Sequence, residues 1–335
     1  MSLFAELHLI RKGQASPFEY PLKYARSALI LAKRRNAAAS VSSSLQGRVL
    51  NHCSALNLKP PAGELNFTDF IAKVYNIGIE NPQLWIYAAT HCLFFMEFDE
   101  YFDGACNTPD NVSRLSMELR ALLRALSRHG LGGLRGDLDD WPTEVPGREA
   151  YRWLLKETEA LRMGAGEMSH YCFLDYCLGI ELEIVEWAPD MYQGNTTKWD
   201  IDRCVEIRKR SAGVLYLMVP LYVANTWIRK EHVAACNDLL YDVAAIGGLA
   251  NDVMWIKHSE ENEMGIQTLK IASRSEVIQY HNDRVRCLRK AILDLDGDTR
   301  SFMEEVEVSI VGVLLWECNA LRYDVNLHTV VDLHT

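Results

Sequence analysis

Two aspartates close an otherwise apolar stretch of this 335-residue chain, and their spacing suits metal chemistry. Asp99 and Asp103 are four residues apart, so on a helix they share one face with Phe95, one turn before Asp99. A buried carboxylate is costly unless it meets a cation. Carboxylate oxygens are also ligands that Mg²⁺ prefers. The pattern therefore predicts either a helix that runs into solvent or one side of a metal site.

A second apolar stretch also ends in polar groups. On a regular helix Asn251 and Ser259 share a face, and Asp252 and Glu260 share another that is rotated by about 100°. Taken alone, such a cluster is more often a solvated helix end than a ligand set. Lys257 lies within the same segment.

Two cationic sites complete the set of residues that could do chemistry. Arg208 shortly precedes Ser211-Ala212-Gly213, a weak point in an apolar helix where backbone carbonyls could be exposed inside the protein. Arg322 and Tyr323 end the last apolar stretch. The alternatives are a solvated cationic turn at the first site and pairing of Arg322 with a helix C-terminus at the second.

In order and spacing these four places resemble the class I terpene synthases of the single-α-domain, microbial and fungal type. Asp99 to Asp103 reads DExxD, where those enzymes carry DDxxD or a variant. Asn251 follows Asp99 by 152 residues, at the place of their second metal motif. Arg208 lies 43 residues before Asn251, as the diphosphate-sensing arginine of those enzymes does. Arg322 lies 71 residues after Asn251 and begins a terminal Arg-Tyr pair.

The resemblance implies a carbon–oxygen lyase that ionises a linear prenyl diphosphate, with farnesyl diphosphate favoured, cyclises the carbocation and releases diphosphate. It implies three Mg²⁺ ions, with Mn²⁺ as an alternative. The implied metal ligands are Asp99, Asp103, Asn251, Ser259 and Glu260. The implied catalytic residues are Asp99, Arg208, Ala212, Arg322 and Tyr323, and the implied substrate-binding residues are Phe95, Arg208, Lys257, Arg322 and Tyr323.

The second metal motif departs from the family pattern NDxx(S/T)xxxE. Trp255 stands where the hydroxyl ligand belongs, Ser259 stands where the glutamate belongs, and Glu260 comes one position late. Either the helix end distorts so that Asn251, Ser259 and Glu260 converge, which we favour, or this metal site is degraded. The alternatives to a cyclase are therefore a prenyltransferase or squalene-synthase-like enzyme, or a protein of this fold with impaired catalysis.

Composition limits the classes of function and the cellular location that the sequence predicts. A net charge of −10 and a pI near 5.5 argue against general nucleic-acid binding, which needs a basic surface. The nine cysteines form no CxxC motif and are odd in number, which predicts reduced thiols. We find no secretory signal and no stretch long enough to span a membrane. These features predict a soluble cytoplasmic protein, either monomer or homodimer.

The elements that must position these residues are all helices. No sustained alternation of β-branched residues and no repeat appears. We predict an all-α, single-domain bundle of about a dozen helices over residues 1–335, with residues 1–60 as an N-terminal arm and helix. The resemblance to the class I terpene synthases implies that these helices surround a central apolar cavity. We predict one helix that begins at Pro82 and ends in the acids. Further helices near the site are predicted over about 112–129, over 148–187 with breaks near Gly164 and Gly179, and over 198–227 with a break at 211–213. Two more are predicted over 231–256 and 300–323.

Overall fold

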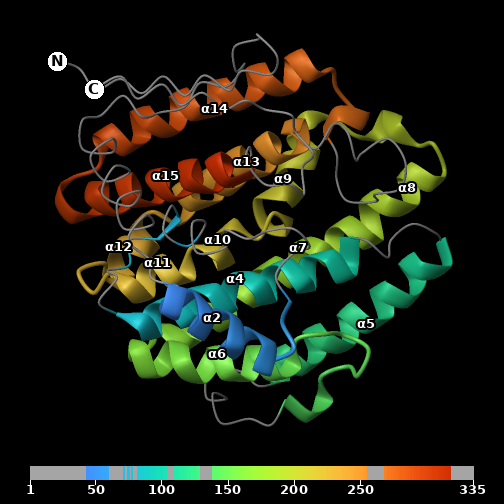
Figure 1. Cartoon of the computed structure of the whole chain (residues 1–335). Coiled ribbons are helices and arrows are strands. Elements are labelled where there is room, and N and C mark those ends of the chain that lie inside the picture. The colour runs from blue at the N-terminus through green and yellow to red at the C-terminus, as the bar shows by residue number, and fades with distance from the viewer. Residues whose placement is uncertain are drawn as a thin grey trace.

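The computed structural model describes residues 43–59, 71, 74–75, 77, 81–103, 109–128, 138–254 and 268–317. Every regular element in these ranges is a helix (Figure 1), which confirms the all-α class. The single domain and the central cavity stay predictions. The α-helices are α2 (Ser43–Ala55), α4 (Pro82–Asp103), α5 (Pro109–Arg128), α6 (Arg148–Leu161), α7 (Ala165–Leu182), α8 (Ala188–Tyr192), α9 (Ile201–Ser211), α10 (Val214–Leu217), α11 (Val219–Ala224), α12 (Lys230–Ala235), α13 (Asn237–Met254), α14 (Arg274–Asp294) and α15 (Gly297–Glu317).

Helix α4 is packed among several other helices of the bundle (Figure 1). It begins as predicted, with Pro82 in the first turn and the Asn81 side chain accepting a hydrogen bond from the Leu84 N–H at 3.2 Å. It is apolar on nearly every side, with Trp85 and Phe94 fully buried, which is typical of a helix enclosed by others. Helices α2, α6 and α11 pack against it. It ends at Asp103, so the acids occupy its last turn as predicted.

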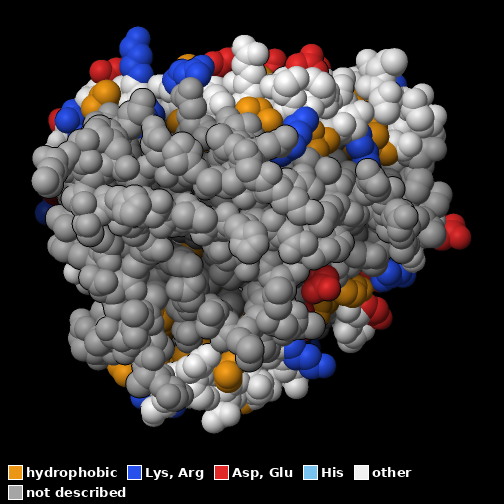
Figure 2. All heavy atoms as spheres, turned by 45° about the horizontal axis from the view of Figure 1, so that its top comes forward, with side chains coloured by type: hydrophobic (Ala, Val, Ile, Leu, Met, Phe, Trp, Pro, Cys, Tyr) orange, Lys and Arg blue, Asp and Glu red, His pale blue; other side chains and the backbone are white. Residues whose placement is uncertain are grey.

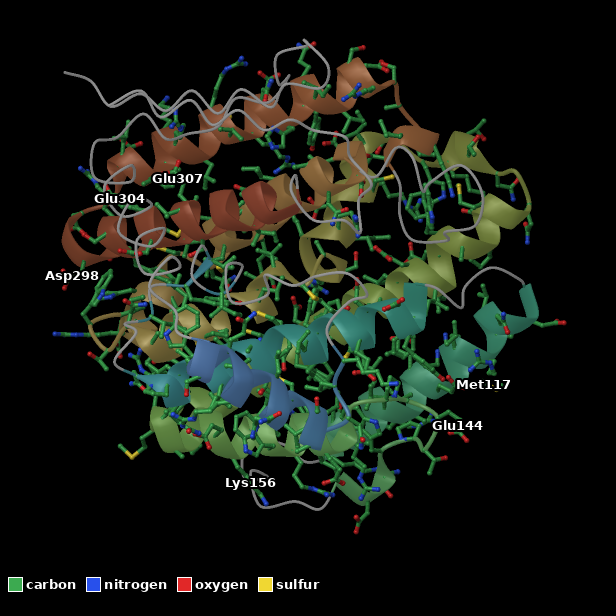
Figure 3. The ribbon with its side chains drawn as sticks, viewed as in Figure 1. Met117, Glu144, Lys156, Asp298, Glu304 and Glu307 are labelled. Atoms are coloured by element: carbon green, nitrogen blue, oxygen red, sulfur yellow. The ribbon has the colours of Figure 1, made fainter. Side chains whose placement is uncertain are left out.

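Helix α5 is amphipathic and lies at the periphery. Leu115, Leu119 and Leu122 are buried on one side, whereas Met117 points away from the bundle and is 67% exposed (Figure 3). The helix begins at Pro109, three residues before the predicted start. Proline suits a first helical turn, because its missing N–H would be unpaired there in any case.

Helix α7 continues without a gap into a π-helical turn at Glu183–Trp187 and then into α8. The predicted break near Gly164 is confirmed, since Gly164 has a left-handed backbone with φ of 79°. The predicted break near Gly179 is wrong. A Cβ at Gly179 would lie 2.7 Å from the Arg210 carbonyl carbon, so this glycine allows close helix packing instead of ending the helix.

The next segment holds the predicted helix break. Helix α9 begins at Ile201 instead of Lys198, because Asp200 caps it by accepting from the Arg203 N–H at 2.8 Å. It ends at Ser211, and Gly213 follows with φ of 65°. This confirms the break at 211–213. A side chain at Gly213 would collide with the ring of Phe95.

Helix α13 joins the upper helices to the rest of the bundle and packs on α9, α14 and α15 (Figure 1). The single helix predicted over 231–256 is instead two helices, α12 and α13, separated at Cys236, whose φ of −107° and ψ of 10° are not helical. The last helix begins at Gly297, close to the predicted start near residue 300.

In the described parts of the chain, the surface side chains, the cysteines and the hydropathy of the helices can be compared with its composition. On the face shown in Figure 2 the described side chains include basic, acidic and apolar groups. The seven cysteines within the described ranges form no disulfide. Within those ranges, no helix combines the length and hydropathy that a membrane crossing requires.

Candidate functional site

Asp99 lies at the inner side of the end of α4. It is partly buried, and the Tyr176 hydroxyl of α7 donates a hydrogen bond to Asp99 Oδ1 at 2.6 Å. Tyr176 itself is 1% exposed. Asp99 therefore contacts a neighbouring helix in the interior. Asp103 belongs to the last turn of α4, but its side chain is not among those described.

Arg208 joins two of the predicted motifs. One amino group of its guanidinium, Nη2, lies 2.5 Å from Asp252 Oδ1, and the other, Nη1, lies 3.7 Å from Glu183 Oε1. The Arg208 side chain is 15% exposed, and the Asp252 and Glu183 side chains are 1% and 7% exposed. Ion pairing so far from water is much less screened than at the surface. The diphosphate-sensor candidate thus contacts the same helix end as Asn251, which is partly buried.

Asp252 is held on its other side as well. The backbone N–H and the hydroxyl of Thr268 donate to Asp252 Oδ2 at 3.2 and 2.9 Å. Thr268 is fully buried. Both carboxylate oxygens of Asp252 are therefore used within the protein, one by Arg208 and one by Thr268.

Glu183 is the third acid of this cluster. It comes from the π-helical turn, and its Oε1 accepts a hydrogen bond from the Ser211 hydroxyl. Burial raises the pKa of Glu183 to about 7; the Arg208 charge and the Ser211 bond oppose this rise, whereas the charges of Asp99 and Asp252 add to it. Asp99 and Asp252 thus act electrostatically on Glu183, and Glu183 and Asp252 both face Arg208.

Phe95 lies one turn below Asp99 and begins an aromatic cluster. Its ring centroid is 5.1 Å from that of Tyr176 and 6.5 Å from that of Tyr216 on α10. Phe94, Phe98 and Phe173 belong to the same cluster. An aromatic surface of this kind can stabilise a passing carbocation and exclude water.

Two other buried aromatic side chains, Trp187 and Tyr222, make contacts outside this cluster. The ring of Trp187 packs on Trp199 in a separate group, with centroids 4.9 Å apart. The ring of Tyr222 is covered by the Arg162 guanidinium, 3.6 Å from its centroid.

The backbone break lies beside the cluster. Ala212 packs against α13, since a Cβ placed on Gly248 would be 3.3 Å from the Ala212 Cβ. Gly213 contacts the Phe95 ring, as noted above. The predicted break thus lies beside the Phe95 ring, and the Gly213 carbonyl accepts a hydrogen bond from the Leu217 N–H at 2.9 Å.

The remaining predicted residues lie outside the described ranges: Lys257, Ser259, Glu260, Arg322 and Tyr323, with Trp255. Among the side chains that are described, no group of three or more His, Cys, Asp or Glu is arranged to hold a metal ion. The donor set that is described nevertheless suits Mg²⁺. Two carboxylates, those of Asp252 and Glu183, lie beside one guanidinium, and Asp99 is close enough to act on the charge of Glu183, so oxygen atoms and excess negative charge meet at the ends of α4 and α13.

Glu183, Tyr176 and Thr268 are site residues that the sequence did not predict. An acid four residues after Gly179 in an apolar helix is an available signal for Glu183, because glycine and acid share a face. Tyr176 and Thr268 carry no such signal. Their roles depend on which helices become neighbours.

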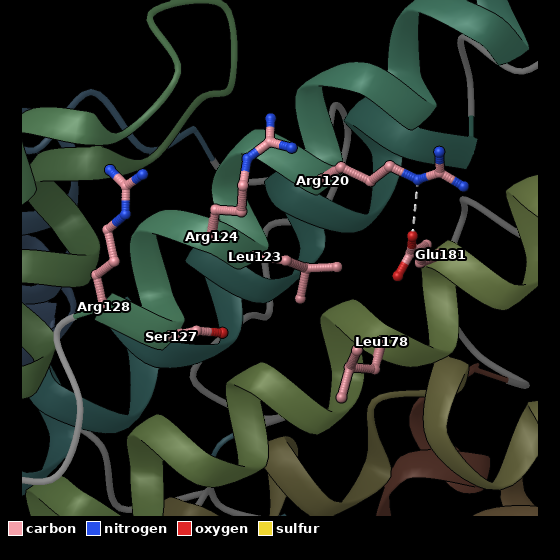
Figure 4. A pocket seen from close by; sticks show the side chains of 7 residues that line it. All are labelled: Arg120, Leu123, Arg124, Ser127, Arg128, Leu178 and Glu181. Carbon is pink, nitrogen blue, oxygen red and sulfur yellow. Dashed lines mark hydrogen bonds and ion pairs between the residues drawn. The ribbon is translucent and has the colours of Figure 1, made fainter.

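A shallow groove lies apart from this site, between α5 and α7 (Figure 4). Its volume is about 460 Å³, and Arg120 Nε pairs with Glu181 Oε1 at 2.9 Å at one side of it. The other lining residues are Leu123, Arg124, Ser127, Arg128 and Leu178. None of the predicted site residues belongs to it.

Comparison with known proteins identifies the fold. No family model matches the chain, and no curated protein matches it in sequence. Among solved structures, α-eudesmol synthase is 15% identical with a TM-score of 0.56, covering 84% of this chain and 96% of that one. Cucumene synthase is 15% identical with a TM-score of 0.54, covering 84% and 94%. The ancestrally reconstructed SVS_A2 protein is 14% identical with a TM-score of 0.54, covering 93% and 91%. The chain therefore has a class I terpene synthase fold.

Proposed function

We propose that the protein is a Mg²⁺-dependent terpene synthase that ionises a linear prenyl diphosphate, with farnesyl diphosphate favoured, and cyclises the resulting carbocation. The observation that carries this proposal is the ion pair of Arg208 with Asp252, together with Asp99 held by Tyr176, whose ring packs on Phe95. An anion-binding group, acids suited to hard cations and an apolar aromatic surface are what such a substrate requires, since it joins a diphosphate to a hydrocarbon tail. The similarity to eudesmol and cucumene synthases supports the same class.

The metal ligands in this proposal are Asp99 and Asp103 on α4 and Asn251 with Ser259 or Glu260 beyond α13. When bound, Mg²⁺ neutralises the negative charge of the diphosphate and so makes it a better leaving group. Tyr176 orients Asp99 through its 2.6 Å hydrogen bond. A ligand held in this way loses less conformational freedom on binding.

Arg208 binds the diphosphate, together with Lys257, Arg322 and Tyr323. A guanidinium offers paired N–H donors that match phosphate oxygens. As the carbon–oxygen bond breaks, its electron pair stays with the diphosphate and the positive charge stays on the allylic carbon. The Ala212 carbonyl directs its dipole toward that charge, and Phe95 contributes its ring face. Loss of a proton, or addition of water followed by loss of a proton, then gives a neutral product.

The test is an assay of the purified protein with Mg²⁺ and geranyl, farnesyl or geranylgeranyl diphosphate, with gas chromatography of the products. We expect a cyclic hydrocarbon or alcohol, and Asp99→Ala should reduce its formation at least about a hundredfold while helical circular dichroism is unchanged. Glu144→Ala changes an exposed acid at the outside of the bundle (Figure 3) and should keep wild-type activity.

The same assay distinguishes the alternatives. Formation of a longer prenyl diphosphate would indicate a prenyltransferase. No product from any of the three substrates would refute the synthase proposal. Full activity of Asp99→Ala would remove Asp99 from the metal site.

A further inference from the structure

Glu183 is a buried acid at the candidate site that the proposed chemistry does not use. It is 5% exposed, accepts the hydrogen bond of the Ser211 hydroxyl, and has Oε1 3.7 Å from Arg208 Nη1. It therefore contacts both ends of the last turn of α9. One end carries the proposed diphosphate-binding arginine, and the other precedes the break at 211–213.

The local backbone explains how Glu183 reaches this position. Gly179 lies one turn earlier on the same side of α7 and brings the backbone of α7 against that of Arg210 and Ser211. The π-helical turn at Glu183–Trp187 then changes the direction of the side chains that follow, and such turns often occur at functional sites. The second acid of this turn, Glu186, points outward and pairs with Arg203 at 3.0 Å. One turn thus carries an inward and an outward glutamate.

We propose that Glu183 is a positioning residue for diphosphate binding, which holds Arg208 and Ser211 so that the guanidinium and the following carbonyls keep a fixed direction. This inference rests on the proposed function. Among the side chains that the structure describes, Asp252 and Glu183 are acidic partners of Arg208. Its Nη2 is bound to Asp252, and its Nη1 faces Glu183. With Glu183 as an anchor, the guanidinium can turn one edge to a diphosphate without losing its orientation.

A purely electrostatic account predicts the opposite effect. A carboxylate close to an anion site repels the anion, so removing its charge should tighten diphosphate binding if Glu183 did nothing else. If Glu183 positions Arg208, removing its charge lets the guanidinium pair fully with Asp252, and diphosphate binding should weaken. The sign of the change therefore separates the two accounts.

Glu183→Gln is the suitable variant, because glutamine keeps the volume and an oxygen that can accept from Ser211, but lacks the charge that attracts Arg208. Calorimetric titration with inorganic diphosphate in the presence of Mg²⁺ should show a dissociation constant about tenfold higher than that of the wild-type protein. With prenyl diphosphate substrate, KM should rise by a similar factor, with a smaller change in kcat. Glu186→Gln, from the same turn, should change neither value more than about twofold.

Unchanged or tighter binding by Glu183→Gln would overturn this inference while leaving the proposed function intact. If the wild-type protein bound no diphosphate with Mg²⁺, the proposed function would fail, and this inference with it. If Glu183→Gln did not fold, Ser211→Ala would carry the test, because it keeps the charge but removes the hydrogen bond that fixes it. Ser211→Ala should also weaken binding, and wild-type affinity in that variant would overturn the inference.

Discussion

His91 shows what burial does to a single residue in this protein. It lies on α4, is fully buried, and neither ring nitrogen has a hydrogen-bond partner within the described part of the chain. Its ring centroid is 4.1 Å from that of Tyr216. Burial lowers the pKa of His91 to about 3, so the folded protein holds a neutral imidazole. In the unfolded chain the same ring takes up a proton near pH 6.5.

The sign of the pH dependence follows from these two pKa values. Between about pH 6.5 and 3, His91 is protonated in the unfolded state but neutral in the folded state. The contribution of His91 to stability is therefore complete above pH 6.5 and decreases as the pH drops below 6.5. We expect His91→Phe to lack this pH-dependent destabilisation. The free energy of unfolding of the variant minus that of the wild type should therefore be about 2 kcal/mol higher at pH 5 than at pH 7. Urea unfolding of both proteins at the two pH values measures this. Parallel pH profiles would show that His91 is not responsible.

At the scale of elements, the contact between α7 and α9 positions the site. A methyl group on Gly179 would meet the backbone of Arg210 and Ser211, which cannot move aside as a flexible side chain can. Gly179→Ala should therefore lower the free energy of unfolding by about 1–3 kcal/mol, although alanine is intrinsically the better helix former. Chemical denaturation measures the change. Gly47→Ala on α2 is the control, because a Cβ there meets nothing within 4 Å and should be neutral or slightly stabilising. A Gly179→Ala protein as stable as Gly47→Ala would contradict this account of the packing.

Local sequence signals predicted some of these elements well. The start of α4 at Pro82, its end in the acids and the break at Gly213 were readable because proline, carboxylates and glycine each restrict the backbone locally. The gap between α12 and α13 was not, since Cys236 carries no such signal. Gly179 was misread because a glycine that ends a helix and one that lets two helices touch look alike in sequence.

The candidate site was predictable to the same extent. Asp99 and Arg208 could be named from residue type and spacing, because metal and diphosphate chemistry need those groups. Their partners could not, since Tyr176, Glu183 and Thr268 reach the site only when α7, α9 and α13 pack together. The π-helical turn that presents Glu183 depends on the same packing.

At the scale of the whole molecule, the candidate site joins helices from distant parts of the chain. Asp99 belongs to α4, Arg208 to α9 and Asp252 to α13, so a ligand that binds them together stabilises the folded chain and has no equivalent site on the unfolded one. Acids that repel one another also cost stability until cations neutralise them. Metal and diphosphate should therefore stabilise the protein more in combination than the sum of their separate effects.

Thermal unfolding tests this coupling. With Mg²⁺ and inorganic diphosphate together, at about 100 times the dissociation constant, binding contributes about 2.7 kcal/mol, which for a chain of this length raises Tm by about 4 °C. Diphosphate without Mg²⁺ should shift Tm little, because Asp99, Glu183 and Asp252 repel it. Asp99→Ala should lose most of the combined shift, since one acid that binds the metal is gone, whereas Glu144→Ala should keep it. An equal shift from diphosphate alone would mean that the anion binds elsewhere, on cations that do not depend on the acids at the ends of α4 and α13.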